Sequence, residues 1–405
     1  MVDRSLIGVL VLDDEPFILK LMGRILAQLG FAQVTTCGSG HAALRWVAER
    51  DGEDSLILCD INMPEMDGIE FLRKLAEQQY GGGLVFVSGE DERALQATEK
   101  LARAHRLMVL GALPKPVQPA SLDALIARWP AQPRRAPRQA RKVYDAGAVR
   151  RAIDRGELEN HFQPQVDLAS GRVVGVESLA RWRHPGDGMV YPDQFIGVAE
   201  EHGLIDDLTR AVIAGAFAQA SRWQDQGLAL RVAVNVSMDN LASLDFPDFV
   251  AGQAAEAGVA PHGVVLEVTE SRLPRDLRAP LEILTRLRLK RFGLSIDDFG
   301  TGHSSLRQLR DMPFDELKID SSFVHGAAGR GTELAIYDAS LGLARQLGMQ
   351  TVAEGIEDRI DWDMVRRSGC HMGQGYFIAR PMPGDELPGW IEDWTRRVRA
   401  EGLAG

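Results

Sequence analysis

Short apolar runs alternate with amphipathic stretches along nearly the whole chain, and this alternation constrains the fold more than any other feature. The first part contains continuous apolar runs that end in polar or turn residues, namely IGVLVLDD, SLILCD, GLVFVSG and RLMVLGALP. Such runs are typical of parallel strands buried on both faces. Between them lie stretches with apolar residues at helical spacing, such as EPFILKLMGRILAQLG. The pattern predicts an α/β protein with helices covering parallel sheets.

One segment interrupts this rhythm. Residues 131–142, AQPRRAPRQARK, contain five basic residues, two prolines and no acidic residue, so they cannot bury an apolar face. We expect an exposed basic linker over 129–144; a patch for nucleic acid or lipid is the alternative, disfavoured by the absence of aromatic residues. The flanking domains are placed at 5–128 and 145–395. Their lengths suit one doubly wound, flavodoxin-like sheet and one TIM-like (β/α)8 barrel.

Composition excludes several classes of function. The net charge is −11, so no overall field attracts the chain to DNA or to anionic lipid. The three cysteines (Cys37, Cys59 and Cys370) are far apart and form no CxxC pair, which disfavours disulfides and cysteine-bound zinc. No run of 18 apolar residues occurs, and the apolar run at the N-terminus is too short for a signal peptide. We therefore expect a cytoplasmic protein with no membrane insertion.

In the first domain, polar side chains follow four separate strands. Asp13 and Asp14 follow the first apolar run, Asp60 follows a later one, Ser88 ends VFVS, and Lys115 follows the last. Ligands of open parallel sheets bind at these carboxyl ends of the strands. Three clustered carboxylates suit Mg²⁺, and a lysine and a hydroxyl suit the oxygens of a phosphoryl group.

This segment resembles the receiver domain of two-component response regulators, through LDDE, CDINMPEMDG, VSGE and LPKP. The resemblance implies that Asp60 is phosphorylated by a sensor histidine kinase. It implies one Mg²⁺ bound by Asp13, Asp14 and Asp60, and phosphate sensing by Ser88 and Lys115. One departure is Ala112, which occupies the position where receivers usually carry an aromatic switch residue.

After the linker, polar residues again stand at the ends of apolar runs. They are separated by 20 to 58 residues, about one βα unit each: Glu177, Asn235, Glu267, Asp297 with Asp298, Lys318, Glu354 and Gln374. Successive strands of a barrel would deliver these groups to one mouth, where barrel enzymes carry out their chemistry. Oxygen ligands of this kind suit Mg²⁺ or Mn²⁺, and adjacent aspartates could serve two ions that activate water against a phosphodiester.

The segment resembles the EAL domain, a phosphodiesterase that linearises cyclic di-GMP, through ESLARWRHP, NVS, EVTE, DDFGTGHSSL, LKID, AEGIE and GQGYFIARP. The resemblance implies one or two ions of Mg²⁺ or Mn²⁺ and assigns the following roles. Metal ligands are Glu177, Asn235, Glu267, Asp297 and Asp298; catalytic groups are Lys318, Glu354 and Asp298; substrate contacts are Gln163, Arg181 and Gln374; and Glu270 braces the loop after Asp298.

The leading hypothesis is thus a response regulator that hydrolyses cyclic di-GMP to linear pGpG under the control of Asp60 phosphorylation. The resemblance also implies a homodimer or a higher homo-oligomer. A noncatalytic cyclic di-GMP receptor that signals through protein contacts is the alternative, although the chain keeps the full ligand set that degenerate EAL domains typically lose.

Overall fold

The computed structural model describes residues 4, 7–49, 55–64, 66–78, 80–89, 92–105, 107–127, 142, 144–269, 278–301 and 306–404, with the backbone alone for 92–94, 96 and 306–308. The chain divides into two compact units, Met1–Arg138 and Gln139–Gly405. No helix within these described ranges has both the length and the hydropathy needed to cross a membrane.

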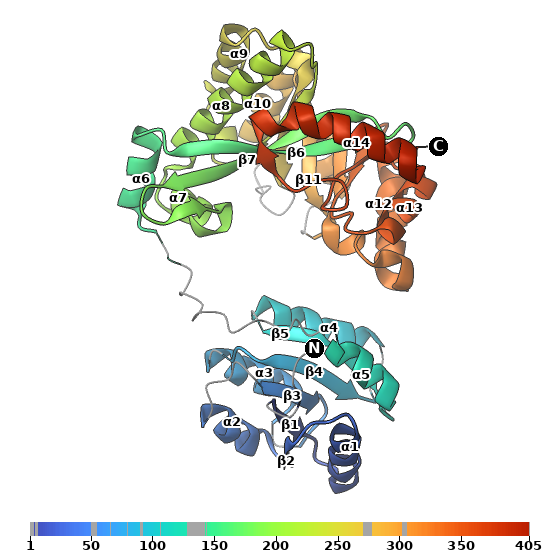
Figure 1. Cartoon of the computed structure of the whole chain (residues 1–405). Coiled ribbons are helices and arrows are strands. Elements are labelled where there is room, and N and C mark those ends of the chain that lie inside the picture. The colour runs from blue at the N-terminus through green and yellow to red at the C-terminus, as the bar shows by residue number, and fades with distance from the viewer. Residues whose placement is uncertain are drawn as a thin grey trace. The chain divides into compact units, whose positions relative to one another are not determined.

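The N-terminal unit is a parallel sheet covered by helices on both faces. Its strands lie in the order β2-β1-β3-β4-β5 (Figure 1). The strands are β1 (Gly8–Leu12), β2 (Gln33–Cys37), β3 (Ser55–Asp60), β4 (Gly83–Ser88) and β5 (Met108–Pro114). The helices are α1 (Pro16–Gln28), α2 (Gly40–Ala48), α3 (Gly68–Glu77), α4 (Glu92–Ala104) and α5 (Pro119–Ala127).

Side chains that alternate along the strands form one core on each face of this sheet. On β1, Val9 and Val11 pack with residues of α1 and α5, whereas Leu10 and Leu12 pack with residues of α2, α3 and α4. The central strands β1, β3 and β4 are buried along their whole length, which explains their continuous apolar sequences. The flavodoxin-like arrangement agrees with the sequence prediction.

The C-terminal unit is a closed barrel. Its ten-stranded sheet runs β15-β6-β14-β13-β12-β11-β10-β9-β7-β8, and an additional pairing of β6 with β7 closes the ring (Figure 1). The strands are β6 (Leu158–Asp167), β7 (Val173–His184), β8 (Gly188–Val190), β9 (Arg231–Val236), β10 (Val264–Thr269), β11 (Gly293–Phe299), β12 (Glu316–Ile319), β13 (Gln350–Ala353), β14 (Met372–Gly373) and β15 (Met382–Pro383). The ring strands β7, β9, β10, β11, β12, β13 and β14 are parallel to one another. Strand β6 is antiparallel to both of its neighbours in the ring, β7 and β14.

Some helices of this unit begin at a side chain that caps them or at proline. Asp145 accepts a hydrogen bond from Ala148 N at the start of α6, and Asp358 accepts two at the start of α13. The helices are α6 (Ala146–Asp154), α7 (Ile196–Glu201), α8 (Ile205–Asp225), α9 (Phe246–Glu256), α10 (Arg278–Leu289), α11 (Leu306–Asp311), α12 (Gly331–Gln346), α13 (Arg359–Ser368) and α14 (Leu387–Glu401).

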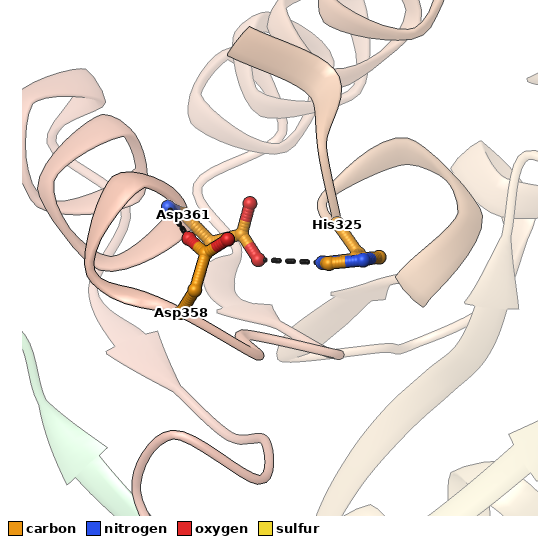
Figure 2. A group of neighbouring side chains, drawn as sticks. All are labelled: His325, Asp358 and Asp361. Carbon is orange, nitrogen blue, oxygen red and sulfur yellow. Dashed lines mark hydrogen bonds and ion pairs between the residues drawn. The ribbon is translucent and has the colours of Figure 1, made fainter. Parts of the chain in front are cut away.

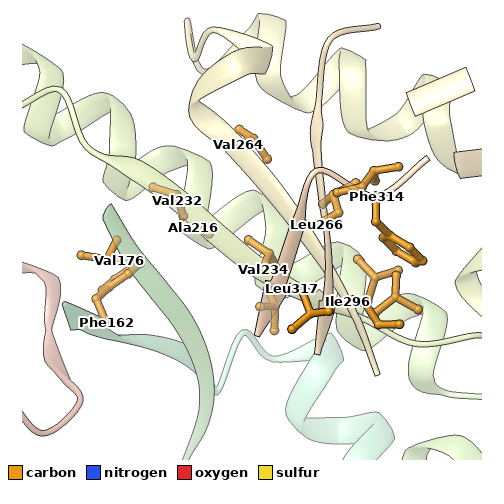
Figure 3. Packing of buried hydrophobic residues seen from close by; sticks show 14 of the residues in the cluster. Phe162, Val176, Ala216, Val232, Val234, Val264, Leu266, Ile296, Phe314 and Leu317 are labelled. Atoms are coloured by element: carbon orange, nitrogen blue, oxygen red, sulfur yellow. The ribbon is translucent and has the colours of Figure 1, made fainter. Parts of the chain in front are cut away.

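The barrel strands separate apolar from polar side chains. Val234, Leu266, Ile296 and Leu317 belong to the core between strands and helices, as Figure 3 shows. Each of them directly precedes a polar residue that the sequence assigns to the mouth, and successive side chains of a strand point to opposite faces. The alternation therefore sends one polar group per strand into the barrel while its apolar neighbour anchors the strand.

Candidate functional site

The carboxyl ends of the barrel strands bring the predicted polar residues together. Glu177 lies on β7, Asn235 on β9, Glu267 on β10 and Lys318 on β12, while Glu354 directly follows β13. These positions are far apart in sequence, but adjacent parallel strands place their ends side by side. The mouth of the barrel is thus built from one residue or two per strand, as the spacing predicts.

Lys318 is the centre of this group. Its side chain is fully buried, and its Nζ lies 2.7 Å from Glu354 Oε1 and 2.9 Å from Glu267 Oε2. The same Nζ lies 3.2 Å from Asp297 Oδ1 and 3.6 Å from Glu177 Oε2. One ammonium therefore contacts four carboxylates in an environment with little water, where such interactions are strong.

Neutral amides hold Glu177 from two sides. Asn235 Nδ2 donates to Glu177 Oε1 at 2.7 Å, and Gln374 Nε2 donates to Glu177 Oε2 at 2.5 Å. Gln374 Nε2 also donates to Gln163 Oε1 at 2.9 Å, which links the last barrel strand to the first. Although burial alone would raise the pKa of Glu177, the Lys318 charge and these hydrogen bonds hold it below its usual value.

Three acids, Glu267, Asp298 and Glu354, have the opposite shift because they are buried close to other carboxylates. Burial, together with the charges of Glu177 and Asp297, raises the pKa of Glu267 well above its usual range. Burial and neighbouring carboxylates raise the pKa of Glu354 to about 8 and that of Asp298 to about 6. Burial would lower the pKa of Lys318, but the surrounding carboxylates raise it. The mouth is thus an anionic site that one lysine does not neutralise.

Asp297 belongs to two groups of acids at once. Ligand oxygens of Glu177, Glu267 and Asp297 lie within 4.8 Å of one another, and so do those of Asp297, Asp298 and Glu354. Asp298 reaches the second group because its backbone bends with a positive φ of 55°, which is uncommon outside glycine. Its N–H donates to Asp297 Oδ1 at 2.9 Å, which fixes the two carboxylates relative to each other. Buried acids with unbalanced charge fit divalent cations such as Mg²⁺ or Mn²⁺.

A cavity of about 380 Å³ opens onto these acids, with Gln163, Gln374, Leu179 and Tyr376 in its lining. Arg181 is buried on β7 with its guanidinium 5.3 Å from the ring centre of Tyr191, and it does not line this cavity. Tyr376 and Tyr191 are both about half exposed, and Arg380 covers the Tyr376 ring at 4.1 Å. Exposed rings of this kind can stack on planar bases.

The receiver-like sheet gathers its predicted residues in the same manner. Lys115 Nζ lies 2.7 Å from Asp60 Oδ2 and 2.8 Å from Asp13 Oδ2. Oxygens of Asp13, Asp14 and Asp60 lie within 4.8 Å of one another, with Asp14 exposed and the other two buried. Ser88 is buried at the end of β4, and its carbonyl accepts a hydrogen bond from Lys115 N at 2.9 Å. All five residues thus meet at the carboxyl ends of the strands.

A further acidic group with a histidine has a structural explanation. His325 Nδ1 lies 2.8 Å from Asp361 Oδ2 (Figure 2), and Asp361 also accepts hydrogen bonds from Gly326 N and Glu357 N. Asp358 Oδ1 caps α13. Since these carboxylates already bind the loop after β12 and the start of α13, we interpret the group as a link between two segments.

Two further points concern the predicted residues. Glu270 lies outside the described residues, so the structure does not place it. Gln165 was not predicted as a site residue, although it is fully buried and donates to Gln374 Oε1 at 3.1 Å. The signal for Gln165 is its spacing of two from Gln163, because residues i and i+2 of a strand share a face.

Comparison with known proteins gives the family. An EAL domain model matches residues 146–381, and a response regulator receiver domain model matches residues 9–127. The cyclic di-GMP phosphodiesterase RocR of Pseudomonas aeruginosa is 32% identical over 379 residues, which cover 93% of this chain and 96% of RocR.

Solved structures agree with the sequence comparison. The PaMucR phosphodiesterase in its c-di-GMP complex matches with a TM-score of 0.57 and 40% identity, over 60% of this chain and 98% of that chain. The EAL enzyme Bd1971, in its cAMP and cyclic-di-GMP bound form, matches with a TM-score of 0.58 and 28% identity, over 60% and 67% of the two chains. Both resemblances inferred from the motifs are confirmed. The chain belongs to the EAL domain family and carries an N-terminal response regulator receiver domain.

Proposed function

We propose that this protein hydrolyses cyclic di-GMP to linear pGpG with the help of divalent cations, and that phosphorylation of Asp60 regulates the reaction. Family membership and the similarity to RocR along nearly the whole chain support a cyclic di-GMP phosphodiesterase of the response-regulator class. The observation that carries the metal-dependent chemistry is the sharing of Asp297 between two acid groups around Lys318.

The residues at the mouth fit metal ions. Glu177, Asn235, Glu267 and Asp297 would hold one cation, and Asp297, Asp298 and Glu354 face the place for a second. When bound, such ions supply a water nucleophile at neutral pH and neutralise charge on the phosphodiester. Five carboxylates around one ammonium favour binding of cations, because each bound charge relieves repulsion among buried acids.

The chain's own groups would divide the remaining work. Gln163 and Gln374, which line the cavity, would bind and orient the dinucleotide with one phosphodiester over the acids, and Arg181 would contact a part of it outside this cavity. Glu354 accepts the proton of the attacking water, and Lys318 holds Glu354 in place through their 2.7 Å contact. A new bond forms from the water oxygen to phosphorus, the bond from phosphorus to the ribose O3′ breaks, and O3′ takes up a proton. The ring opens to give pGpG.

In the receiver domain, Asp60 would accept a phosphoryl group from a sensor histidine kinase. Asp13 and Asp14 would hold one Mg²⁺ beside it, and Lys115 and Ser88 would bind the transferred oxygens. The 2.7 Å contact of Lys115 with Asp60 supports this assignment, because the same ammonium can follow the new charge. We further propose a homodimer as the form in which phosphorylation reaches the barrel, through the loop after Asp298.

The direct test incubates the purified full chain with Mg²⁺ and cyclic di-GMP and separates the products by chromatography. We expect pGpG from the parent and none from Glu177→Gln. Glu256→Gln is the matched control, since Glu256 is an exposed acid at the end of α9. Recovery of bound but intact nucleotide from the parent would refute the proposed activity and support the noncatalytic receptor.

A further inference from the structure

Beneath the acids of the mouth, the barrel interior contains a second layer of polar side chains. Ser295 lies two residues before Asp297 on β11, and Glu316 lies two residues before Lys318 on β12, so both point into the barrel. In the parallel register, Ser295 is the direct neighbour of Glu267 on one side and of Glu316 on the other. Glu267 and Ser295 have no exposed surface, and Glu316 is 2% exposed.

Each of these three neighbouring side chains has one buried oxygen that is not hydrogen-bonded. The atoms are Glu267 Oε1, Ser295 Oγ and Glu316 Oε1, and none has a hydrogen-bond partner among the described residues. Buried polar atoms without partners are rare because each costs free energy. Three on adjacent strands at matching positions therefore indicate a common ligand that lies between them.

The charges of the layer identify the kind of ligand. Glu267 Oε2 already contacts Lys318 Nζ at 2.9 Å, and Glu316 Oε2 contacts Arg231 Nη2 at 2.7 Å. Each of these two carboxylates thus already contacts one cation through its other oxygen. The free atoms are two carboxyl oxygens, which can accept, and one hydroxyl, which can donate. A water molecule donates two hydrogen bonds and accepts others, so it complements this set.

We propose that Glu267, Ser295 and Glu316 bind one buried water molecule, and that Ser295 and Glu316 position the Glu267 carboxylate through it. The water donates to Glu267 Oε1 and Glu316 Oε1 and accepts from the Ser295 hydroxyl. It restrains rotation of Glu267, so that Oε2 stays toward Lys318 and the other acids. The positioning role rests on the proposed function of Glu267 as a metal ligand, whereas the water site itself does not.

The first test is a high-resolution crystal structure of the metal-free full chain. We expect density for one water within hydrogen-bond distance of the three oxygens. A direct hydrogen bond from Ser295 Oγ to either carboxylate, without water between, would overturn the proposal. So would density whose short ligand distances identify a metal ion.

The second test measures Mn²⁺ binding by calorimetry for the full chain and two serine variants. Ser295→Ala removes one partner of the water, and we expect a dissociation constant about 10-fold higher, as for other partners that orient metal ligands. Ser340→Ala is the matched control, because Ser340 is also buried but donates to Ile336 O within α12. Equal Mn²⁺ affinity in Ser295→Ala and the parent, with both folded by thermal melts, would refute the positioning role. If the parent makes no pGpG but Ser295→Ala still binds Mn²⁺ more weakly than the parent does, this inference is supported while the proposed activity fails.

Discussion

The ammonium of Lys318 lies 2.9 Å from Glu267 Oε2, and neither side chain has any surface exposed to solvent. Such a pair is stable only when each partner is present, because an unpaired buried charge is costly. Around this pair the barrel collects three further carboxylates that belong to other strands, so the same lysine balances part of the charge of each.

Replacing this lysine should therefore destabilise the metal-free protein. We expect Lys318→Met to lower the free energy of unfolding by about 3–5 kcal/mol at neutral pH, since four buried carboxylates lose their common cation. Denaturant unfolding in the presence of a chelator measures the change. Lys290→Met, which removes a surface contact with Asp248, should cost less than about 1 kcal/mol. Equal losses in the two variants would argue against the central position of Lys318.

Metal binding should release protons. Burial raises the pKa of Glu354 to about 8 and that of Asp298 to about 6, so in the absence of metal Glu354 holds its proton at neutral pH and Asp298 holds one in mildly acidic buffer. A divalent cation must displace those protons, and its affinity should increase with pH between about 6 and 8. Calorimetry of Mn²⁺ binding in buffers of different ionisation enthalpy counts the protons. Glu354→Gln should remove the part of the pH dependence near 8, and an affinity independent of pH would contradict the prediction.

Gly375 should tolerate no side chain. A Cβ at this position would collide with the backbone N and O of Ile356, and the backbone cannot give way as a flexible side chain can. Because Gln374 is the preceding residue, Gly375→Ala should move its amide from Glu177 and lower kcat/KM by about 100-fold. Gly389→Ala is the control, since its added Cβ meets no atom within 4 Å. Steady-state rates of pGpG formation measure kcat/KM for both variants, and full activity of Gly375→Ala would contradict the prediction.

The His325–Asp361 link should stabilise the barrel domain in a pH-dependent way. The hydrogen bond to Asp361 raises the pKa of His325 above its usual value. The protonated histidine is thus favoured in the folded state, so its contribution is complete below about pH 6.5 and is lost as pH rises through the folded value. Thermal melts of the parent and His325→Gln should therefore differ most in mildly acidic buffer and converge in alkaline buffer. A difference that is constant with pH would show that protonation plays no part.

Phosphorylation should depend on Asp60. We expect a small phosphodonor with Mg²⁺ to modify the parent and change its rate of cyclic di-GMP hydrolysis, because the new charge alters the contacts of Lys115. Asp60→Asn should be neither modified nor responsive, while its basal hydrolysis remains. Gel retardation of the phosphoprotein and parallel rate assays provide the measurements. A rate change in Asp60→Asn on treatment would place the phosphorylated residue elsewhere.

Much of the architecture followed from local pattern. Continuous apolar strands such as Leu56–Cys59 predicted a sheet buried on both faces, and β3 is buried throughout. The position of Glu267 in an apolar run predicted that its strand delivers it to the barrel mouth, and on β10 it lies beside Lys318 while Leu266 packs in the core. Such patterns can be read locally because side-chain direction in a strand depends only on its period of two.

The antiparallel direction of β6 was not predicted, although the sequence carries a signal for it. Only five residues, 168–172, connect β6 to β7, and this connection is too short for the crossover that two parallel strands need. Gln163 therefore faces Glu177 across an antiparallel register.

The sequence by itself determined the order of strands and helices and the set of polar residues at the strand ends, because both depend on local period and spacing. Only the tertiary structure decided that Asp297 serves two acid groups, that Lys318 contacts four carboxylates, and that Ser295 lies between Glu267 and Glu316. These relations depend on the register and closure of the barrel, which place atoms from distant segments within a few ångströms. The electrostatic interactions and hydrogen bonds involved join residues of different segments, so no single segment of the sequence specifies them.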